Sequence, residues 1–319
     1  EINNKLEIII GHGDIDDNTF NIKSTKQSIS AIKNNFSASA ADIAAIIYSS
    51  GSTGRPKGIT ITHQNIYDGA RIVSTYLSTQ ENDRISGVLS FNFDYGLNQL
   101  WQVILKGATL YLHDFIFPND FFMHISENRI TAVPIMPVII SKMFDRRFYS
   151  ENPSLDFTCV RYISTSGGRI SLDMINDLTT TFKSAKIYSM YGLTEAFRST
   201  YLDPEQIKIR PNSIGKAIPE VETFVLNDNQ QLCKPNEIGE LVHRGACISK
   251  GYWGSTKKTA ERFKVIDMFP NETVVFSGDL VKMDDDGFLY FIGRKDSMIK
   301  TQGYRVSPSE VEDEANKHE

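Results

Sequence analysis

Short apolar runs alternate with helical patterns over the first two-thirds of the chain. Such runs are typical of strands buried in a parallel sheet, and the stretches between several of them carry apolar residues at helical spacing. The alternation predicts an α/β fold in which helices cover a mostly parallel sheet. The predicted strands span residues 43–48, 59–61, 87–91, 108–112, 132–135, 162–164 and 186–189.

A helix is predicted directly after residues 59–61. Thr62 is a suitable N-cap, because its hydroxyl can accept a hydrogen bond from the first turn. Ile66, Ala70, Val73 and Leu77 then follow at helical spacing and form one apolar face.

The pattern changes after about residue 212 to short strands joined by tight turns. Residues 228–229 and 284–287 carry the Asp, Asn and Gly residues of hairpin turns. We therefore predict an α/β subdomain at residues 1–211 and a β-rich subdomain at residues 212–295. The strands predicted in the second are 222–226, 239–243, 273–276 and 288–292.

Composition narrows the class of protein. The 319 residues are 40% hydrophobic and carry a formal net charge of −5, so no broad basic surface for nucleic acid is expected. No apolar run reaches the ~18 residues that a membrane-spanning helix needs. Cys159, Cys233 and Cys247 are widely spaced and form no CxxC pair, so we expect reduced thiols, no zinc site and a cytoplasmic location.

Residues 48–58 are the strongest local signal, reading Tyr-Ser-Ser-Gly-Ser-Thr-Gly-Arg-Pro-Lys-Gly. Glycines let backbone N–H groups turn inward, the hydroxyls add donors, and Arg55 and Lys57 add positive charge, which together suit a polyphosphate. The spacing is not that of a Walker A loop. From composition alone, a flexible surface turn is an equal alternative.

This segment resembles the phosphate-binding loop of the AMP-forming adenylate-forming superfamily, which includes acyl-CoA synthetases, firefly luciferase and peptide-synthetase adenylation domains. Further motifs of the family follow in order. They are Thr-His-Gln-Asn at 62–65, Ser-Gly-Gly at 166–168, Tyr-Gly-Leu-Thr-Glu at 191–195, Gly-Glu-Leu at 239–241, Gly-Tyr-Trp at 251–253, Ser-Gly-Asp at 277–279 and Gly-Arg-Lys-Asp at 293–296. The resemblance covers residues 48–312 and implies the large N-terminal domain of such an enzyme.

The resemblance implies a two-step reaction. A carboxylate attacks the α-phosphate of ATP, with Mg²⁺ bound, to give acyl-AMP and pyrophosphate, and a thiol of CoA or phosphopantetheine then displaces AMP. Because carboxylate and triphosphate repel each other, the site must neutralise charge and hold the two in line. The implied partners are a small carboxylic acid and an acyl or peptidyl carrier protein.

The resemblance implies roles for particular residues. Glu195 is expected to hold Mg²⁺ and Thr194 to bond the α-phosphate, and with Lys57 they form the implied catalytic set. Tyr191 would stack on adenine, and Asp279 would accept the ribose hydroxyls. The implied ATP- or AMP-binding residues are Ser49, Ser50, Gly51, Ser52, Thr53, Gly54, Lys57, Gly167, Gly168, Tyr191, Gly192, Thr194, Asp279 and Arg294.

Each of these residues has a plainer interpretation. Thr194 and Glu195 could begin a helix as an N-cap and an acidic first-turn residue. Tyr191 could be an ordinary core residue, the glycines at 167–168 a simple turn, and Arg294 a surface ion pair worth ~0–1 kcal/mol.

Residues 296–319 resemble the hinge and the beginning of a C-terminal lid domain. Asp296 occupies the hinge position, and Lys300 and Gly303 lie in a segment that faces the thiol in relatives. Relatives carry a longer N-terminal part and a lid lysine that steadies the transferring phosphate. We therefore expect this chain to be truncated at both ends and poorly active by itself.

The motifs disagree about the substrate. Residues 303–312 resemble acyl-CoA synthetases, and residues 93–100 resemble acyl-CoA ligases associated with bacterial exosortase systems. Asp94, however, follows Phe93 as in amino-acid-activating relatives, where this aspartate binds the substrate ammonium. A carrier-loading adenylation domain and a nucleotide-binding remnant without activity stay open as alternatives. The identity of the acid, the thiol and the oligomeric state are left open.

Overall fold

The computed structural model describes residues 38–49, 56–145, 147, 152–296, 299–301, 304–306 and 311. Contacts divide the chain into two compact units. Among these described residues, the first unit comprises those from 38–47 and 61–188, and the second comprises those from 48–60 and 189–311. Strand β7 (Lys186–Leu193) begins in the first unit and continues into the second. The subdomain boundary after residue 211 stays a prediction.

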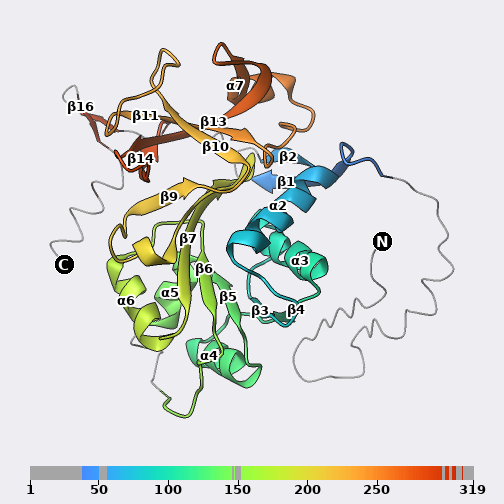
Figure 1. The fold of residues 1–319 in the computed structure, drawn as a ribbon, viewed down its shortest axis with the longest axis vertical. Coiled ribbons are helices and arrows are strands. Elements are labelled where there is room, and N and C mark those ends of the chain that lie inside the picture. The colour runs from blue at the N-terminus through green and yellow to red at the C-terminus, as the bar shows by residue number, and fades with distance from the viewer. Residues whose placement is uncertain are drawn as a thin grey trace. The chain divides into compact units, whose positions relative to one another are not determined.

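The first unit is built on parallel strands in the order β6, β5, β3 and β4. The β5 and β6 strands are buried along their whole length, as expected for strands that are covered on both faces. In Figure 1, α2 and α3 lie on one side of β5 and β6, and α5 and α6 lie on the other. The elements of the first unit are α2 (His63–Tyr76), β3 (Arg84–Gly87), α3 (Asp94–Lys106), β4 (Thr109–Leu112), α4 (Pro118–Glu127), β5 (Ala132–Ile135), α5 (Pro137–Met143), β6 (Tyr162–Thr165) and α6 (Leu172–Thr181).

Helix α2 begins where the sequence predicts. The Thr62 hydroxyl accepts the Asn65 N–H at 3.0 Å, and the Asn65 side chain accepts the Thr62 N–H at 3.1 Å, forming a capping box. Ala70, Val73 and Leu77 of the predicted apolar face are buried. Helix α2 packs against α3, which in turn contacts β3 and β4.

One predicted strand is displaced. Residues 87–91 were expected to be extended, whereas β3 spans Arg84–Gly87 and the chain then turns into α3. The pairing with β4 ends at the Gly87–Leu112 pair, where β4 itself ends. Gly96 in the first turn of α3 packs its bare Cα against the Ser90 carbonyl, which a side chain would prevent. The backbone of residues 89–90 therefore lies against the first turn of α3 instead of extending the strand.

The second unit is an antiparallel sheet in the order β10, β11, β13, β14, β9, β8 and β7, with β12 paired to β13. All four strands predicted in this part of the chain are present. Helix α7 packs against β12 and β13 (Figure 1). The elements are β8 (Ala196–Leu202), η1 (Pro204–Gln206), β9 (Ser213–Ala217), β10 (Val221–Leu226), β11 (Ile238–Gly245), α7 (Thr256–Arg262), β12 (Phe263–Ile266), β13 (Phe269–Met283), β14 (Leu289–Arg294), β15 (Ile299–Thr301) and β16 (Tyr304–Val306).

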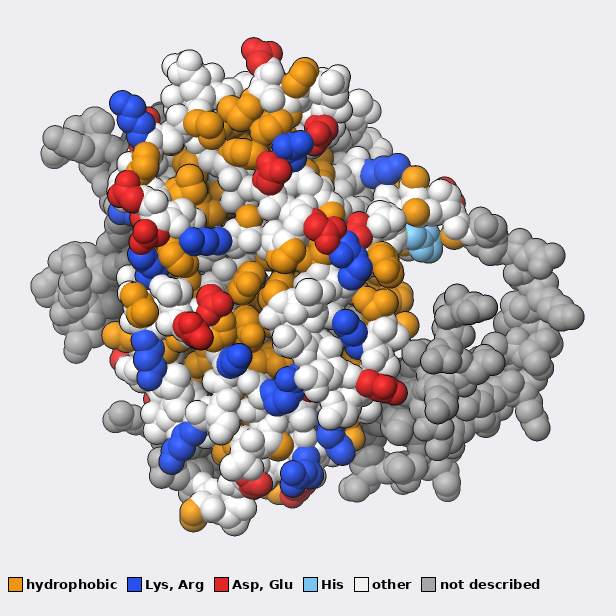
Figure 2. All heavy atoms as spheres, in the orientation of Figure 1, with side chains coloured by type: hydrophobic (Ala, Val, Ile, Leu, Met, Phe, Trp, Pro, Cys, Tyr) orange, Lys and Arg blue, Asp and Glu red, His pale blue; other side chains and the backbone are white. Residues whose placement is uncertain are grey.

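Strands β1 (Ile43–Ser49) and β2 (Lys57–Thr62) form a separate two-stranded sheet on either side of the glycine-rich loop. Strands β15 and β16 form another. In Figure 2, charged side chains of both signs are interspersed with apolar ones on the face in view. No helix in the described part of the chain is long and apolar enough to cross a membrane.

Candidate active site

A tight hairpin between β7 and β8 carries four of the predicted site residues. Leu193 pairs with Ala196, so Thr194 and Glu195 form the two-residue turn between the strands. The alternative that these residues begin a helix is therefore wrong. Short-range sequence could not separate the two, because threonine and acidic residues favour helix starts and turns alike.

Gly192 is required by the shape of this hairpin. The register shifts between Tyr191 and Leu193, where β8 bulges at residues 197–199. Arg198 in that bulge has a left-handed φ of 53°, and its backbone nitrogen would lie only 2.6 Å from a Cβ at position 192. A glycine lets the bulge approach β7 closely, which fixes where the turn residues lie.

Asp279 on β13 lies between two donors. The Tyr191 hydroxyl donates to its Oδ2 at 2.5 Å, and Arg294 Nη1 donates to its Oδ1 at 2.7 Å. Arg294 is the residue directly opposite Asp279 in the β13–β14 pairing. Asp279 is 5% exposed, and this burial raises the pKa of its carboxyl, while Tyr191 and Arg294 act to lower it. The ion pair between Arg294 and Asp279 is thus not a simple surface pair, since Asp279 is buried.

A β-bulge at residues 277–279 of β13 contains Asp279 and is held by side chains on three elements. Gly278 has a left-handed φ of 74°, and its N–H donates to Glu240 Oε1 at 3.0 Å. Arg262 of α7 donates to the Ser277 carbonyl, and the Ser277 hydroxyl donates to the Leu241 carbonyl at 2.7 Å. The sequence analysis did not predict the role of Arg262. For Glu240, the only indication in the sequence was its place in the Gly-Glu-Leu motif.

Tyr191 stacks on a buried histidine. The Tyr191 and His243 ring centroids are 6.2 Å apart and the planes differ by 18°. His243 is fully buried, and neither ring nitrogen has a hydrogen-bond partner among the described residues. Burial lowers the pKa of His243 to about 3, so its imidazole is neutral. Burial, followed by the Asp279 charge, raises the pKa of Tyr191, which keeps its hydroxyl protonated as the donor to Asp279.

Glu195 and Lys57 meet at Tyr252. The Tyr252 hydroxyl donates to Glu195 Oε1 at 2.6 Å, and Lys57 Nζ lies 5.2 Å from the centre of the Tyr252 ring. Burial and the neighbouring Glu195 charge raise the pKa of Tyr252, so its hydroxyl stays protonated. Tyr252 was noted in the Gly-Tyr-Trp motif, but no role was predicted for it.

Backbone hydrogen bonds of residues 247–253 explain why Glu195 and Lys57 both lie next to Tyr252. At one end, the Ser249 N–H donates to the Glu195 carbonyl at 2.9 Å. At the other, the Thr60 N–H donates to the Gly251 carbonyl at 2.9 Å, and the Trp253 N–H donates to the Gly58 carbonyl at 2.7 Å. One segment therefore connects the turn that carries Glu195 to the strand that begins at Lys57.

The remaining predicted residues are not all described. Ser49 ends β1, whereas Ser50, Gly51, Ser52, Thr53, Gly54 and Gly303, and the side chain of Lys300, lie outside the described residues. The Asp296 Oδ1 lies 3.5 Å from the Arg294 Nε. Gly167, Gly168 and Asp94 belong to the first unit.

Asp94 is the first residue of α3 and is half-buried. An acidic side chain is favoured at this end of a helix by the helix dipole. Further along α3, the Gln99 amide donates to the Tyr95 carbonyl at 3.2 Å, and the Asn98 oxygen accepts from Gln102 at 2.7 Å.

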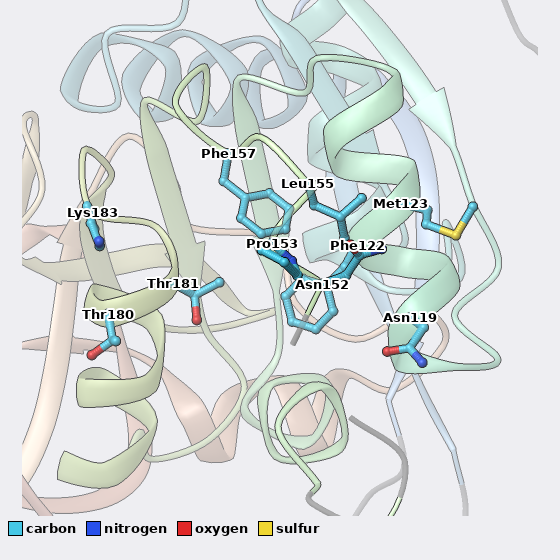
Figure 3. Close-up of a pocket in the computed structure, with 10 residues that line it drawn as sticks. All are labelled: Asn119, Phe122, Met123, Asn152, Pro153, Leu155, Phe157, Thr180, Thr181 and Lys183. Carbon is cyan, nitrogen blue, oxygen red and sulfur yellow. The ribbon is translucent and has the colours of Figure 1, made fainter. Parts of the chain in front are cut away.

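The first unit also contains a pocket of about 540 Å³. Figure 3 shows Phe122, Leu155 and Phe157 gathered in its middle, with Lys183 and Asn119 farther out. The Phe122 and Phe157 ring centroids are 5.7 Å apart. None of the predicted site residues lines this pocket, whose lining is Asn119, Phe122, Met123, Asn152, Pro153, Leu155, Phe157, Thr180, Thr181 and Lys183.

A metal held by protein ligands alone is not indicated. Among the described residues, no group of three or more His, Cys, Asp or Glu side chains could hold an ion. Glu195 offers a single carboxylate whose Oε2 has no hydrogen-bond or ion-pair partner in the described part of the chain. That donor fits Mg²⁺, which takes few carboxylates and completes its shell with phosphate oxygens and water.

Comparison with known proteins identifies the family. The model of the AMP-binding enzyme family matches residues 3–253. The chain belongs to this family. Among curated relatives, tyrocidine synthase 1 of Brevibacillus parabrevis is 29% identical, and the match covers 87% of this chain and 25% of that protein.

Solved structures of similar proteins share the fold of this chain. The O-succinylbenzoate coenzyme A synthetase MenE of Bacillus subtilis, in complex with AMP, aligns with a TM-score of 0.76 at 26% identity over 86% of this chain and 54% of MenE. The same enzyme was also solved with ATP and a magnesium ion. VinN in complex with L-aspartate aligns with a TM-score of 0.73 at 28% identity over 85% of this chain and 65% of VinN. The chain spans 5–25% of the curated relatives' length and about half of MenE.

Proposed function

We propose that the chain supplies the nucleotide site of an AMP-forming acid–thiol ligase. The enzyme would join a carboxylate to the α-phosphate of ATP, release pyrophosphate, and transfer the acyl group to a thiol. The observation that carries this proposal is the buried Asp279 carboxylate between Tyr191 and Arg294. A buried carboxylate with fixed donors on both oxygens is pre-organised to accept the two hydroxyls of a ribose.

The neighbouring residues have the chemistry that the other parts of ATP require. Tyr191 offers an aromatic ring for adenine, and Thr194 offers a hydroxyl donor for the α-phosphate from the β7–β8 turn. Lys57 follows the glycine-rich loop and supplies positive charge for the phosphates. These groups reduce the repulsion between the attacking carboxylate and the triphosphate, the main electrostatic barrier of the first step.

Magnesium and the thiol complete the proposed reaction. Glu195 would hold Mg²⁺, which neutralises phosphate charge when bound. MenE was solved with ATP and magnesium, which supports this pair for a family member of the same fold. CoA is proposed as the thiol by analogy with MenE, and a phosphopantetheine-bearing carrier protein by analogy with the peptide synthases.

The decisive experiment is ATP–pyrophosphate exchange by the full-length protein across a panel of carboxylic and amino acids. Acid-dependent exchange that Asp279→Ala abolishes would support the proposal. Binding of AMP without exchange for any acid would indicate a nucleotide-binding remnant, and absence of AMP binding by folded protein would contradict the site assignment itself.

Asp94 favours an amino acid as a second candidate substrate. A carboxylate at the start of α3 could bind the substrate ammonium, and VinN was solved with L-aspartate. Asp94→Ala separates the two candidates in the exchange assay. If the substrate is an amino acid, the apparent affinity for it falls sharply while simple acids gain. Unchanged selectivity would show that Asp94 is structural and the substrate an ordinary acyl acid.

A further inference from the structure

Tyr252 contacts both Glu195 and Lys57. Its hydroxyl lies 2.6 Å from Glu195 Oε1, and its ring lies 5.2 Å from Lys57 Nζ. Since a carboxylate can only accept, the phenol must be the donor. A hydrogen bond to a charged acceptor is about twice as strong as one between neutral groups.

Tyr252 is itself firmly held. Its side chain is 6% exposed, and its ring packs edge-on against Phe263 with centroids 5.8 Å apart. Its N–H donates to the Thr259 hydroxyl at 2.9 Å, and its backbone bridges to Ile59 of β2. Gly251, with a φ of 100°, lets the chain pass close to the Thr259 side chain. Both the position and the direction of the phenol are therefore set by packing around it.

Glu195 lacks such support of its own. It is a half-buried residue in the β7–β8 turn, and ordering its long side chain costs rotamer entropy. The Tyr252 hydroxyl is the only hydrogen-bond donor to this carboxylate among the described residues. The Tyr252 hydroxyl occupies Oε1, and Oε2 has no partner among the described residues. A carboxylate that binds one metal through one oxygen needs one oxygen left open in this way.

We propose that Tyr252 is a positioning residue for the metal: its hydroxyl fixes the Glu195 carboxylate in the orientation that binds Mg²⁺ of the Mg²⁺·ATP complex. The inference deepens the proposed function and rests on Glu195 as the metal ligand. Residues that hydrogen-bond a ligating carboxylate orient it, and losing one typically lowers metal affinity or activity about 10- to 100-fold.

The test is Tyr252→Phe in the full-length protein. This change removes only the hydroxyl and keeps the ring that packs against Phe263 and lies near Lys57. Mn²⁺ serves as the probe, because its electron paramagnetic resonance signal reports binding of Mn²⁺·ATP directly. We expect Mn²⁺·ATP affinity to fall about 10- to 100-fold, whereas AMP affinity in the presence of EDTA stays unchanged.

Tyr290→Phe is the matched control. Its hydroxyl also donates to a carboxylate, Asp284 Oδ2 at 3.0 Å, within the same unit. This control should leave Mn²⁺·ATP affinity at the wild-type value. Equal losses in both variants would show a general effect of removing a phenol hydroxyl and would overturn the proposal.

A double variant separates positioning from a structural role. If Tyr252 acts through Glu195, then Tyr252→Phe has no further effect on Mn²⁺·ATP affinity in a Glu195→Gln background, because the carboxylate it orients is gone. Additive losses, or AMP affinity that falls together with Mn²⁺·ATP affinity, would overturn the proposal. Because these readouts measure binding, failure of acid-dependent exchange in the wild type would contradict the proposed reaction without deciding the role of Tyr252.

Discussion

Asp279 and Arg294 face each other across the β13–β14 pair, and Arg294 Nη1 lies 2.7 Å from Asp279 Oδ1. Fifteen residues separate them in sequence, and the tight turn after Met283 brings them together. In that turn, the Asp284 carboxylate accepts the Phe288 N–H at 2.8 Å. Two of the predicted nucleotide-binding residues are thus paired by strand register, in a hairpin that the sequence marks with Asp and Gly.

Asp279→Ala should weaken AMP binding. The change removes the acceptor for the ribose hydroxyls and leaves the Tyr191 hydroxyl and Arg294 without their buried partner. We expect a loss of about 1–3 kcal/mol in binding free energy, measured by titration calorimetry with AMP. Asp286→Ala is the control, since Asp286 pairs with Arg210 at an exposed turn. Equal affinities for wild type and Asp279→Ala would rule out the ribose role.

His243 should make the fold sensitive to acid. Its pKa is about 3 in the folded state, against about 6.5 in an unfolded chain. Between these pH values the unfolded state binds one more proton, so stability falls as pH drops from 6.5, by about 1.4 kcal/mol per pH unit from this group alone.

The measurement for His243 is the difference in unfolding free energy between His243→Leu and wild type as a function of pH. We expect the variant to lose less stability than wild type as pH falls below 6.5, because the leucine does not titrate. His63→Leu, at the exposed start of α2, is the control for replacing a histidine by leucine. Parallel curves for His243→Leu and wild type would contradict a buried neutral histidine.

Gly192→Ala should destabilise the second unit. The added methyl would lie 2.6 Å from the Arg198 nitrogen, so β7 and β8 must separate or the bulge must rearrange. Overpacking of this kind costs about 1–3 kcal/mol, which thermal unfolding would show as a lower Tm. Gly168→Ala is the comparison, because its Cβ would meet Pro137 Cγ at 3.4 Å, an ordinary contact. A Tm for Gly192→Ala that matches this comparison would mean that the bulge tolerates a side chain.

Thr62→Ala should lower the stability of the first unit through α2. The variant loses the side chain that accepts the Asn65 N–H, and replacing an N-cap threonine by alanine typically costs about 0.5–2 kcal/mol. Chemical denaturation would measure the change. Thr75→Ala removes the same hydroxyl from an exposed position of the same helix and should have little effect. Equal effects would show that the cap itself contributes nothing.

The sequence determined what depends on local chemistry. Thr62 and the apolar face that follows it predicted where α2 begins, because capping and helical spacing involve neighbouring residues only. The alternation of short apolar runs predicted β4, β5 and β6 of the parallel sheet but placed the strand before them at residues 87–91 instead of Arg84–Gly87. Asp and Gly residues predicted the hairpin turn before β14. The family motifs named Asp279, Arg294, Tyr191 and Glu195 before any contact between them was known.

Only the tertiary structure decided how those residues are held. Thr194 and Glu195 suited a helix start as well as a turn, and the β7–β8 register made them a turn. Nothing local to Tyr252, Arg262 or His243 indicates that they contact Glu195, Ser277 and Tyr191. Each of these contacts joins residues far apart in sequence through strand pairing and burial, and strand register depends on the free energy of the whole sheet and not on the residues at one position.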